Sequence, residues 1–200
     1  MKRIILLRHG QTEWNNAGRF QGTTDVALDD VGRQQADRAA KALAAIGPHS
    51  VFASDLSRAH DTAVPLAGLI GASVQVDPRL RERGYGPWEG LTRAEVSAAF
   101  PERFADWEAR RPFHVDGIEQ QDEVAERGRE VLESIAATLP ADGTAVVVSH
   151  GGVLRQAVAA FLGWNLAQAD TISGLGNCCW ADVQQGGSGW RLHGYNKSAP

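Results

Sequence analysis

The sequence predicts an α/β fold, a three-layer sandwich with a mostly parallel central sheet flanked by helices. Apolar runs of strand length alternate with longer segments of helical periodicity, as in strand–helix–strand units. The central positions of segments 3–8 and 144–149 are all apolar, as expected of strands covered on both faces. With 43% hydrophobic residues among 200, the chain can build a sizeable core. We therefore expect a single domain over residues 1–200.

The N-terminal half is expected to alternate strands with helices. Strands are predicted at 3–8, 50–54 and 74–76, and helices at 29–46 and 57–71. The acidic pair Asp29-Asp30 opens the first helix and Gly47-Pro48 stops it. Asp55 or Ser57 is expected to cap the second helix. The segment 74–76 is assigned as a strand because its apolar residues alternate with a polar one.

The C-terminal half is expected to continue the alternation and to end in a hairpin. We predict a charged, glycine-rich loop at 78–90, helices at 92–110, 119–139 and 151–162, and a strand at 144–149. The first of these helices should break near Pro101. Residues 178–183 and 190–195 alternate around a glycine-rich turn, which indicates a hairpin. Such a hairpin could provide the edge of a homodimer.

Charge and apolar runs exclude several classes of protein. The formal net charge is −4 and like charges are dispersed, so the chain has no footprint for nucleic-acid binding. The N-terminal apolar run is too short for a signal sequence, and no stretch has the length of a membrane span. We expect a cytoplasmic protein without a membrane partner. The adjacent Cys178 and Cys179 are interpreted as thiols filling a strand, not as a disulfide or a metal site.

The most informative motif is Arg8-His9-Gly10, at the end of the first expected strand. An arginine fork binds two phosphate oxygens at once and spreads their charge. A histidine that is neutral near pH 7 has a free ring nitrogen that can act as a nucleophile. The glycine lets the backbone approach a ligand closely. Together these residue types indicate chemistry on a phosphate group.

Two further candidates follow other expected strands. Arg58 comes after the strand at 50–54, and His150 comes directly after the strand at 144–149. Ligands of parallel sheets bind beyond the carboxyl ends of the strands, so we expect these side chains to meet His9 there.

Each candidate also has a purely structural interpretation. Arg58 could pair with Asp55 or Asp61 on its own helix, and His150 could cap the helix that follows it. Glu82 could belong to a surface ion-pair cluster with the arginines around it.

Five separated segments together resemble the histidine phosphatase superfamily, also called phosphoglycerate-mutase-like. They occur in the family's order and at compatible spacing, from residue 3 to about residue 165. The segments are 6–15, which includes Arg8-His9-Gly10, then 20–22, 54–62, 80–90 and 148–152.

The resemblance implies a role for each matching residue. His9 would take the phosphoryl group as phosphohistidine, with the Gly10 carbonyl fixing its tautomer. Arg8, Arg58 and His150 would surround the phosphoryl group, and Glu82 would act first as general acid and then as general base. Partial burial and a dianionic phosphate alongside would help Glu82 hold its proton. Further hydrogen bonds to the small phosphoester substrate would come from Thr12, Asn15, Gln21, Gly22 and Gly151. Neither a cofactor nor a metal ion is implied.

The family contains both phosphatases and cofactor-dependent phosphoglycerate mutases. The segment 91–118 is short for the cover of a mutase, and Trp88-Glu89-Gly90 is similar to the phosphatases, which we favour. Tyr85-Gly86 and the segment 107–111 are similar to the mutases, so a 2,3-bisphosphoglycerate-dependent mutase remains the alternative. Arg110 and Arg111 either bind a second acidic group of the substrate or end a helix.

One segment departs from the pattern of the phosphatase branch. Where that branch has Gly-Gly-Glu-Ser, this sequence has Gly117-Ile118-Glu119-Gln120, so no role can be assigned to the missing serine. The run 174–192 resembles family members that act on a phosphorylated sugar acid. Several aromatic residues would suit a large organic leaving group, namely Trp14, Phe20, Tyr85, Trp88, Trp107 and Phe113.

Two other classes of function remain open. A metal-dependent hydrolase could be assembled from His9, His150 and Glu82, and activity in EDTA would argue against it. A phosphoester-binding module without catalysis is a further class, although every expected catalytic position is occupied.

Overall fold

The computed structural model describes residues 1–200, apart from the side chain of Leu166. Its centre is a six-stranded sheet with the order β3-β2-β4-β1-β5-β6. The strands are β1 (Arg3–Arg8), β2 (Ser50–Ala53), β3 (Val74–Val76), β4 (Thr144–Ser149), β5 (Trp180–Gly186) and β6 (Gly189–Lys197). The first four are mutually parallel, whereas β5 and β6 form the expected antiparallel hairpin. The predicted fold class is confirmed.

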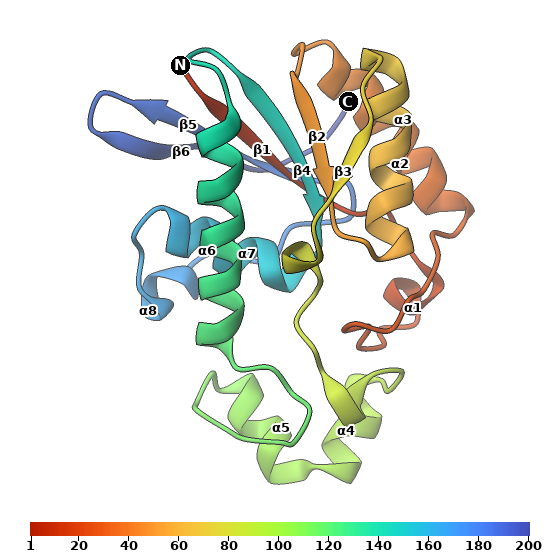
Figure 1. Ribbon diagram of the computed structural model, residues 1–200. Coiled ribbons are helices and arrows are strands. Elements are labelled where there is room, and N and C mark those ends of the chain that lie inside the picture. The colour runs from red at the N-terminus through yellow and green to blue at the C-terminus, as the bar shows by residue number, and fades with distance from the viewer.

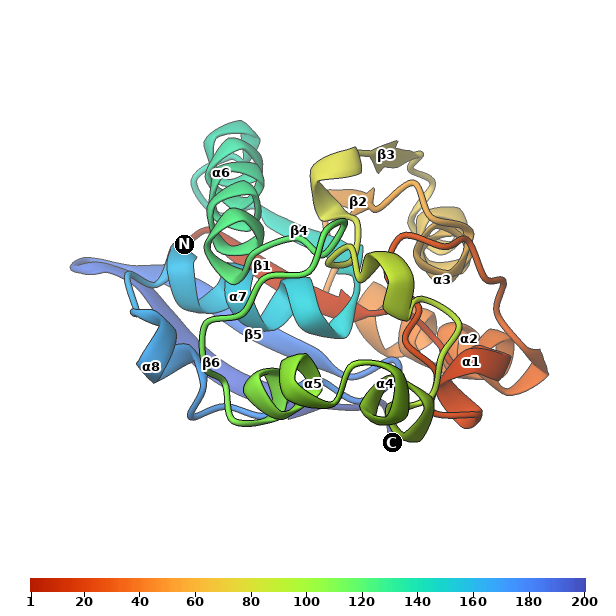
Figure 2. The same ribbon diagram turned by 90° about the horizontal axis from the view of Figure 1, so that it is seen from below.

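Helices cover both faces of this sheet, and two of them lie beyond its end (Figure 1). α2 and α3 lie on one face, α6 and α7 on the other, and α4 and α5 sit below the end to which β4 points (Figures 1 and 2). The helices are α1 (Glu13–Asn16), α2 (Asp30–Ala44), α3 (Ser57–Ile70), α4 (Arg93–Ala99), α5 (Pro101–Glu108), α6 (Gln121–Thr138), α7 (Gly151–Phe161) and α8 (Leu166–Ala169), with short 3₁₀ turns at Pro78–Leu80 and Gly86–Trp88.

Alternation along the buried strands divides the core in two. Ile5 and Leu7 of β1 pack with α2 and α3, while Ile4 and Leu6 pack with α6 and α7. Successive side chains of a strand point to opposite faces, so a continuous apolar run serves both layers.

The register of β1 and β4 positions the strand ends. The two strands pair in parallel, with Arg8 opposite Ser149. The residues that follow, His9 and His150, therefore leave neighbouring strands at the same level. β2 pairs with the other edge of β4, and the chain then leads into α3 with Arg58. One edge of the sheet thus receives residues that are far apart in the sequence.

The expected N-terminal cap of α3 is wrong. Neither Asp55 nor Ser57 caps α3, whose N-cap residue is Leu56. Instead Asp25 accepts hydrogen bonds from the amide and the hydroxyl of Ser57, each at 2.8 Å, while Asp55 binds Arg81. A carboxylate distant in the sequence has replaced the local cap, which sequence spacing does not reveal.

The cysteine pair does not fill a strand. Both thiols are free and lie just before β5, with Cys178 at φ +51°. The Cys178 amide donates to the carbonyl oxygen of Arg8 at 3.1 Å. The pair therefore belongs to the loop that packs beside the His9 loop.

Half of the 14 aromatic residues belong to a separate small core at α4 and α5. Trp88 is fully buried there and stacks on Phe113 with ring centroids 5.5 Å apart. The expectation that Trp88 contacts a leaving group is therefore wrong, because its surface is covered by protein. The cluster holds α4 and α5 against the end of the sheet.

Two helical glycines predict opposite effects of the same substitution. A Cβ at Gly68 of α3 would meet no atom within 4 Å, whereas a Cβ at Gly128 of α6 would lie 2.7 Å from the Ala157 Cβ of α7. We expect Gly68→Ala to raise the free energy of unfolding by about 0.5–1 kcal/mol, because alanine loses less backbone entropy. Gly128→Ala should lower it by about 1–3 kcal/mol through overpacking. Urea denaturation measures both, and a stabilised Gly128→Ala would contradict the close contact of α6 and α7.

Candidate active site

His9 lies in the loop after β1 and is held in one tautomer. The side chain is 3% exposed, and its Nδ1 lies 2.7 Å from the carbonyl oxygen of Gly10. That oxygen can only accept, so Nδ1 carries the proton and Nε2 keeps its lone pair. Burial, reinforced by the cations Arg8 and Arg58, lowers the pKa of His9 well below its ordinary value. The ring is therefore neutral near pH 7, as a nucleophile must be.

The loop that carries His9 is pressed against the start of α2. A Cβ on Gly10 would lie 2.4 Å from the carbonyl oxygen of Gly32. The Gly10 amide donates to the Thr62 hydroxyl of α3 at 3.0 Å, and the His9 amide donates to the Ser149 carbonyl at 2.9 Å. Glycine is required at position 10 because two backbone segments meet there.

Arg58 is fully buried and points into the site from α3. Its guanidinium donates to the carbonyl oxygens of Thr24 at 2.8 Å and Gly22 at 2.7 Å, and its Nε lies 3.2 Å from Nδ1 of His150. The interpretation as a helix-surface ion pair is wrong. Burial lowers the pKa of Arg58, with Glu82 opposing that effect. Arginine nevertheless stays charged in proteins, so the site contains a fixed cation.

His150 presents a neutral donor next to His9. It occupies the N-cap position of α7, but its side chain does not cap the helix, so that interpretation is also wrong. Since Nδ1 accepts from Arg58, the ring proton is on Nε2. The rings of His9 and His150 have centroids 5.1 Å apart. Burial, then the charge of Arg58, lowers the pKa of His150 well below its ordinary value.

Two buried donors of this cluster have no protein acceptor among the described residues. They are Nε of Arg8 and Nε2 of His150. Arg8 is oriented by its Nη1, which donates to the Leu175 carbonyl at 2.7 Å. Because an unsatisfied buried donor costs free energy, such groups are typical of a site that binds an acceptor. Both donors, with two guanidinium groups nearby, favour an oxyanion ligand.

Glu82 approaches the same end of the sheet from the loop after β3. One carboxylate oxygen accepts from the amides of Arg83 at 2.8 Å and Val153 at 3.0 Å, and the other accepts from Gly152 at 3.0 Å. Two of these amides belong to the N-terminus of α7, where the helix dipole also favours an anion. These contacts fix the position of the carboxylate.

The surface-cluster interpretation of Glu82 is wrong. Arg79 binds Asp77 with N–O distances from 2.7 Å, and Arg81 binds Asp55. Glu82 itself is directed to backbone amides of α7 and makes no ion pair with either arginine.

The other residues expected to bind substrate join the same network. Thr12 caps α1, and its hydroxyl donates to the Gln21 side chain at 3.1 Å. Asn15 accepts from Asn177 at 3.1 Å. Gly22 presents its carbonyl to Arg58, and Gly151 lies beside the Arg8 side chain.

Sequence reasoning missed three residues that hold this site. Asn177 donates to the carbonyl of His9 at 3.1 Å as well as to Asn15, Leu175 orients Arg8, and Thr62 anchors Gly10. The run 174–177 is visible as a glycine-rich segment before the hairpin, but its contacts depend on how the chain returns to β1. No local signal marks Thr62 within its helix.

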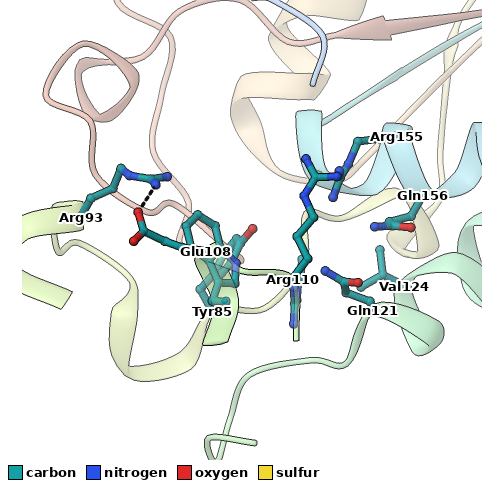
Figure 3. A pocket seen from close by; sticks show the side chains of 11 residues that line it. Tyr85, Arg93, Glu108, Arg110, Gln121, Val124, Arg155 and Gln156 are labelled. Carbon is teal, nitrogen blue, oxygen red and sulfur yellow. Dashed lines mark hydrogen bonds and ion pairs between the residues drawn. The ribbon is translucent and has the colours of Figure 1, made fainter. Parts of the chain in front are cut away.

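A cavity of about 250 Å³, shown in Figure 3, borders Gly152, whose amide donates to Glu82. It is strongly basic, with four arginines in its wall. Arg93 pairs with Glu108 at 2.6 Å, and Asp170 accepts from both Arg110 at 2.9 Å and Arg155 at 3.0 Å. The lining residues are Arg83, Tyr85, Arg93, Trp107, Glu108, Arg110, Gln121, Val124, Gly152, Arg155 and Gln156.

Several further groups shape this cavity. Burial raises the pKa of Tyr85 to about 12, so its hydroxyl is a neutral donor at neutral pH. Gln156 is buried, and its side-chain oxygen has no partner among the described residues. A second cavity of about 430 Å³ shares Arg83, Trp107 and Arg110 with the first and adds Arg111, which pairs with Asp106. His114 is exposed, bound to Asp116, and lines neither cavity.

Comparison with known proteins identifies the class of this site. Residues 4–198 match the histidine phosphatase superfamily (branch 1), and the chain belongs to this family. It is a phosphomonoester hydrolase.

Three individual proteins show how similar the chain is to members of this family. A glucosyl-3-phosphoglycerate phosphatase of Mycolicibacterium vanbaalenii is 37% identical over 216 aligned positions, covering 100% of this chain and 96% of the relative. A probable phosphoglycerate mutase of Erwinia tasmaniensis is 36% identical, covering 98% and 90%. A solved mycobacterial glucosyl-3-phosphoglycerate phosphatase in complex with VO3 superimposes with a TM-score of 0.92 at 38% identity, covering 99% of this chain and 100% of that one.

The described part of the chain contains neither a metal-binding cluster of side chains nor a membrane-spanning helix. No group of three His, Cys, Asp or Glu residues there is arranged to hold a metal ion, so His9, His150 and Glu82 do not form the metal site considered from the sequence. No helix there is long and apolar enough to cross a bilayer.

The two buried histidines predict an acid-sensitive fold. Their pKa values are lowered in the folded state, so below about pH 6.5 the unfolded chain binds protons that the folded chain does not. The free energy of unfolding should therefore fall as pH drops below 6.5, by up to about 1.4 kcal/mol per pH unit for each histidine. His9→Asn should have a shallower slope between pH 6.5 and 5 in urea denaturation. Equal slopes would show that His9 does not contribute.

Proposed function

We propose that residues 1–200 form one catalytic domain that hydrolyses small phosphate monoesters without a metal ion, through phosphohistidine at His9. The main support for this proposal is the buried, neutral His9, whose tautomer leaves Nε2 free. Beside it are Arg8, Arg58 and His150, and two of these have buried donors without an acceptor among the described residues. This arrangement supports in-line attack on a phosphoryl group whose oxygens those donors bind.

In the first step, Nε2 of His9 forms a bond to phosphorus as the bond to the ester oxygen breaks. The departing oxygen takes a proton from Glu82 and leaves as the alcohol. Arg8, Arg58 and His150 stabilise the charge on the three remaining phosphoryl oxygens. Glu82 receives that proton from solvent when the substrate binds.

In the second step, the Glu82 carboxylate takes a proton from water, and the water oxygen attacks phosphorus. The bond to His9 breaks, and inorganic phosphate leaves. The amides of Arg83, Gly152 and Val153 hold the carboxylate in place for this step.

We further propose a phosphorylated sugar acid, such as glucosyl-3-phosphoglycerate, as the substrate. The arginine-lined cavity adjoins Glu82, where the leaving group would lie, and guanidinium groups suit a carboxylate. Trp107 and the glutamines Gln121 and Gln156 suit a sugar ring and its hydroxyls. The glucosyl-3-phosphoglycerate phosphatases among the relatives, and the resemblance of the run 174–192 to such enzymes, support the same substrate class.

Phosphoglycerate mutase activity is the second candidate. Tyr85 and Arg110, which are similar to mutase positions, do line the cavity, and one relative is a probable phosphoglycerate mutase. The short segment between Gly90 and Glu119 favours the phosphatase, because a mutase must shield its phosphohistidine from water.

Product analysis separates the two candidates. The purified protein in EDTA is given 3-phosphoglycerate with a trace of 2,3-bisphosphoglycerate, and 2-phosphoglycerate and free phosphate are followed together. Glucosyl-3-phosphoglycerate, phosphoserine and p-nitrophenyl phosphate are tested in parallel. We expect phosphate release without isomerisation, fastest from glucosyl-3-phosphoglycerate. Rapid 2-phosphoglycerate formation would identify a mutase, and loss of all activity in EDTA would contradict a metal-independent mechanism.

Replacing the nucleophile should abolish turnover. His9→Ala removes the only ring nitrogen placed to form the covalent intermediate, so hydrolysis of p-nitrophenyl phosphate should be lost while circular dichroism stays unchanged. Denatured, alkali-stable phosphoprotein should form from wild-type protein and not from His9→Ala. A variant with normal turnover would refute the proposed intermediate.

Glu82→Gln should have an effect that depends on the leaving group. An alkoxide needs a proton to depart, so alkyl phosphates should be hydrolysed about 10²–10⁴-fold more slowly. p-Nitrophenolate leaves without a proton, so the first step with p-nitrophenyl phosphate should slow much less, as measured by the burst of p-nitrophenol. Equal slowing of both substrate classes would show that Glu82 is not the acid.

A further inference from the structure

Arg127 of α6 binds the backbone of the loop that carries Glu82. Its Nη1 donates to the carbonyl oxygens of Arg79 and Arg81, both at 2.7 Å, and its Nη2 reaches the carbonyl of Glu82 at 3.3 Å. The carbonyl between them, that of Leu80, accepts from the Ser149 hydroxyl at 2.6 Å. Four consecutive carbonyls are therefore held by side chains from two other elements.

The same guanidinium is fixed in place by Glu119. Arg127 Nε lies 2.6 Å from one carboxylate oxygen of Glu119, and Nη2 lies 2.8 Å from the other, a paired geometry that orients both groups. Both side chains are largely buried. Glu119 also joins the segment after Glu82, since its carboxylate accepts from the Gly84 amide at 3.2 Å and its carbonyl accepts from Arg83 at 2.7 Å.

The carboxylate of Glu82 is held from the opposite side by α7. Its oxygens accept from the amides of Gly152 and Val153, while its backbone is bound from α6. The two helices are in direct contact one residue from Arg127, where Gly128 meets Ala157. The position of Glu82 is therefore set by a rigid pair of helices, although the residue itself lies on a loop.

We propose that Arg127 and Glu119 form a clamp that positions Glu82 for proton transfer. This inference rests on the proposed role of Glu82 as acid and base. Both side chains bind the loop 79–84 and each other, so both are positioning residues. A proton is transferred efficiently only over a hydrogen-bond distance, and a displacement of about 1 Å can cost 10²-fold in rate. Glu119 therefore has a role in this proposal that the sequence of the Gly117–Gln120 segment did not indicate.

The clamp predicts a defect that depends on the leaving group. In Arg127→Met the loop loses its three donors, so hydrolysis of substrates with poor leaving groups should slow about 10- to 100-fold. p-Nitrophenyl phosphate should change far less, because its leaving group needs no proton. The first step is measured on a series of substituted phenyl phosphates, whose dependence on leaving-group pKa should become steeper than in the wild-type protein.

Arg129→Met is the matched control. Arg129 lies two residues further along α6 and makes ion pairs with Glu126 and Glu133, each at 2.6 Å, but it does not touch the loop. This control removes an arginine and its ion pairs from the same helix and should keep the wild-type dependence. A double-mutant cycle adds a second test, because Arg127→Met should cost little more once Glu82→Gln has removed the acid.

The outcomes separate the clamp from the catalytic role on which it rests. If Glu82→Gln does not steepen the leaving-group dependence, the role of Glu82 is wrong and the clamp fails with it. If Glu82→Gln steepens it while Arg127→Met behaves like Arg129→Met, the clamp alone is refuted. Should Arg127→Met fail to fold, Arg127→Lys and Glu119→Gln give the same comparison. The proposal is supported by a steepened dependence in either variant and refuted by the dependence of the wild-type protein in both.

Discussion

The parallel pairing of β1 with β4 is the constraint on which the site depends. With Arg8 opposite Ser149, β1 and β4 end side by side at the same edge of the sheet, and each is followed by a histidine. The His9 amide bonds to the Ser149 carbonyl, which extends the pairing by one step beyond the strands. A slip of one residue would turn Ile5 and Leu7 from one core to the other, so the packing of both sheet faces enforces the register. The position of the histidines is thus determined by the hydrophobic core.

Burial gives this site its electrostatic character. His9 and His150 are kept neutral by desolvation and by the arginines beside them, while the arginines remain charged. The result is a cationic site with a free ring nitrogen and preoriented donors. Such a site can accept the negative charge of a phosphate dianion, and its donors need no reorganisation to bind the oxygens. His9 donates to the Gly10 carbonyl and Arg58 donates to His150, and these two hydrogen bonds fix the tautomers. Nε2 of His9 therefore keeps its lone pair, and Nε2 of His150 carries a proton.

The cavity beside the site also contains positive charge, but its arginines are arranged differently. Three of its four arginines are paired with carboxylates of the protein: Asp170 binds both Arg110 and Arg155, and Glu108 binds Arg93. These pairs are partly exposed, so each contributes little to stability and can be rearranged. A substrate carboxylate can compete for such arginines at low cost. Under the proposed function, this cavity discriminates among leaving groups with residues of α4, α5 and α7 and with Arg110 after α5.

The sequence by itself determined the alternation of elements, and it placed the candidate residues of the site at strand ends. Those features are local, because periodicity and a short motif can be read without knowing which segments meet. The tertiary structure decided the rest. Asp25 replaced the expected cap of α3, Trp88 became core, Asn177 and Thr62 joined the site, and Arg127 bound the Glu82 loop. Each of these depends on contacts between residues distant in the sequence, formed only when helices and loops pack around the completed sheet.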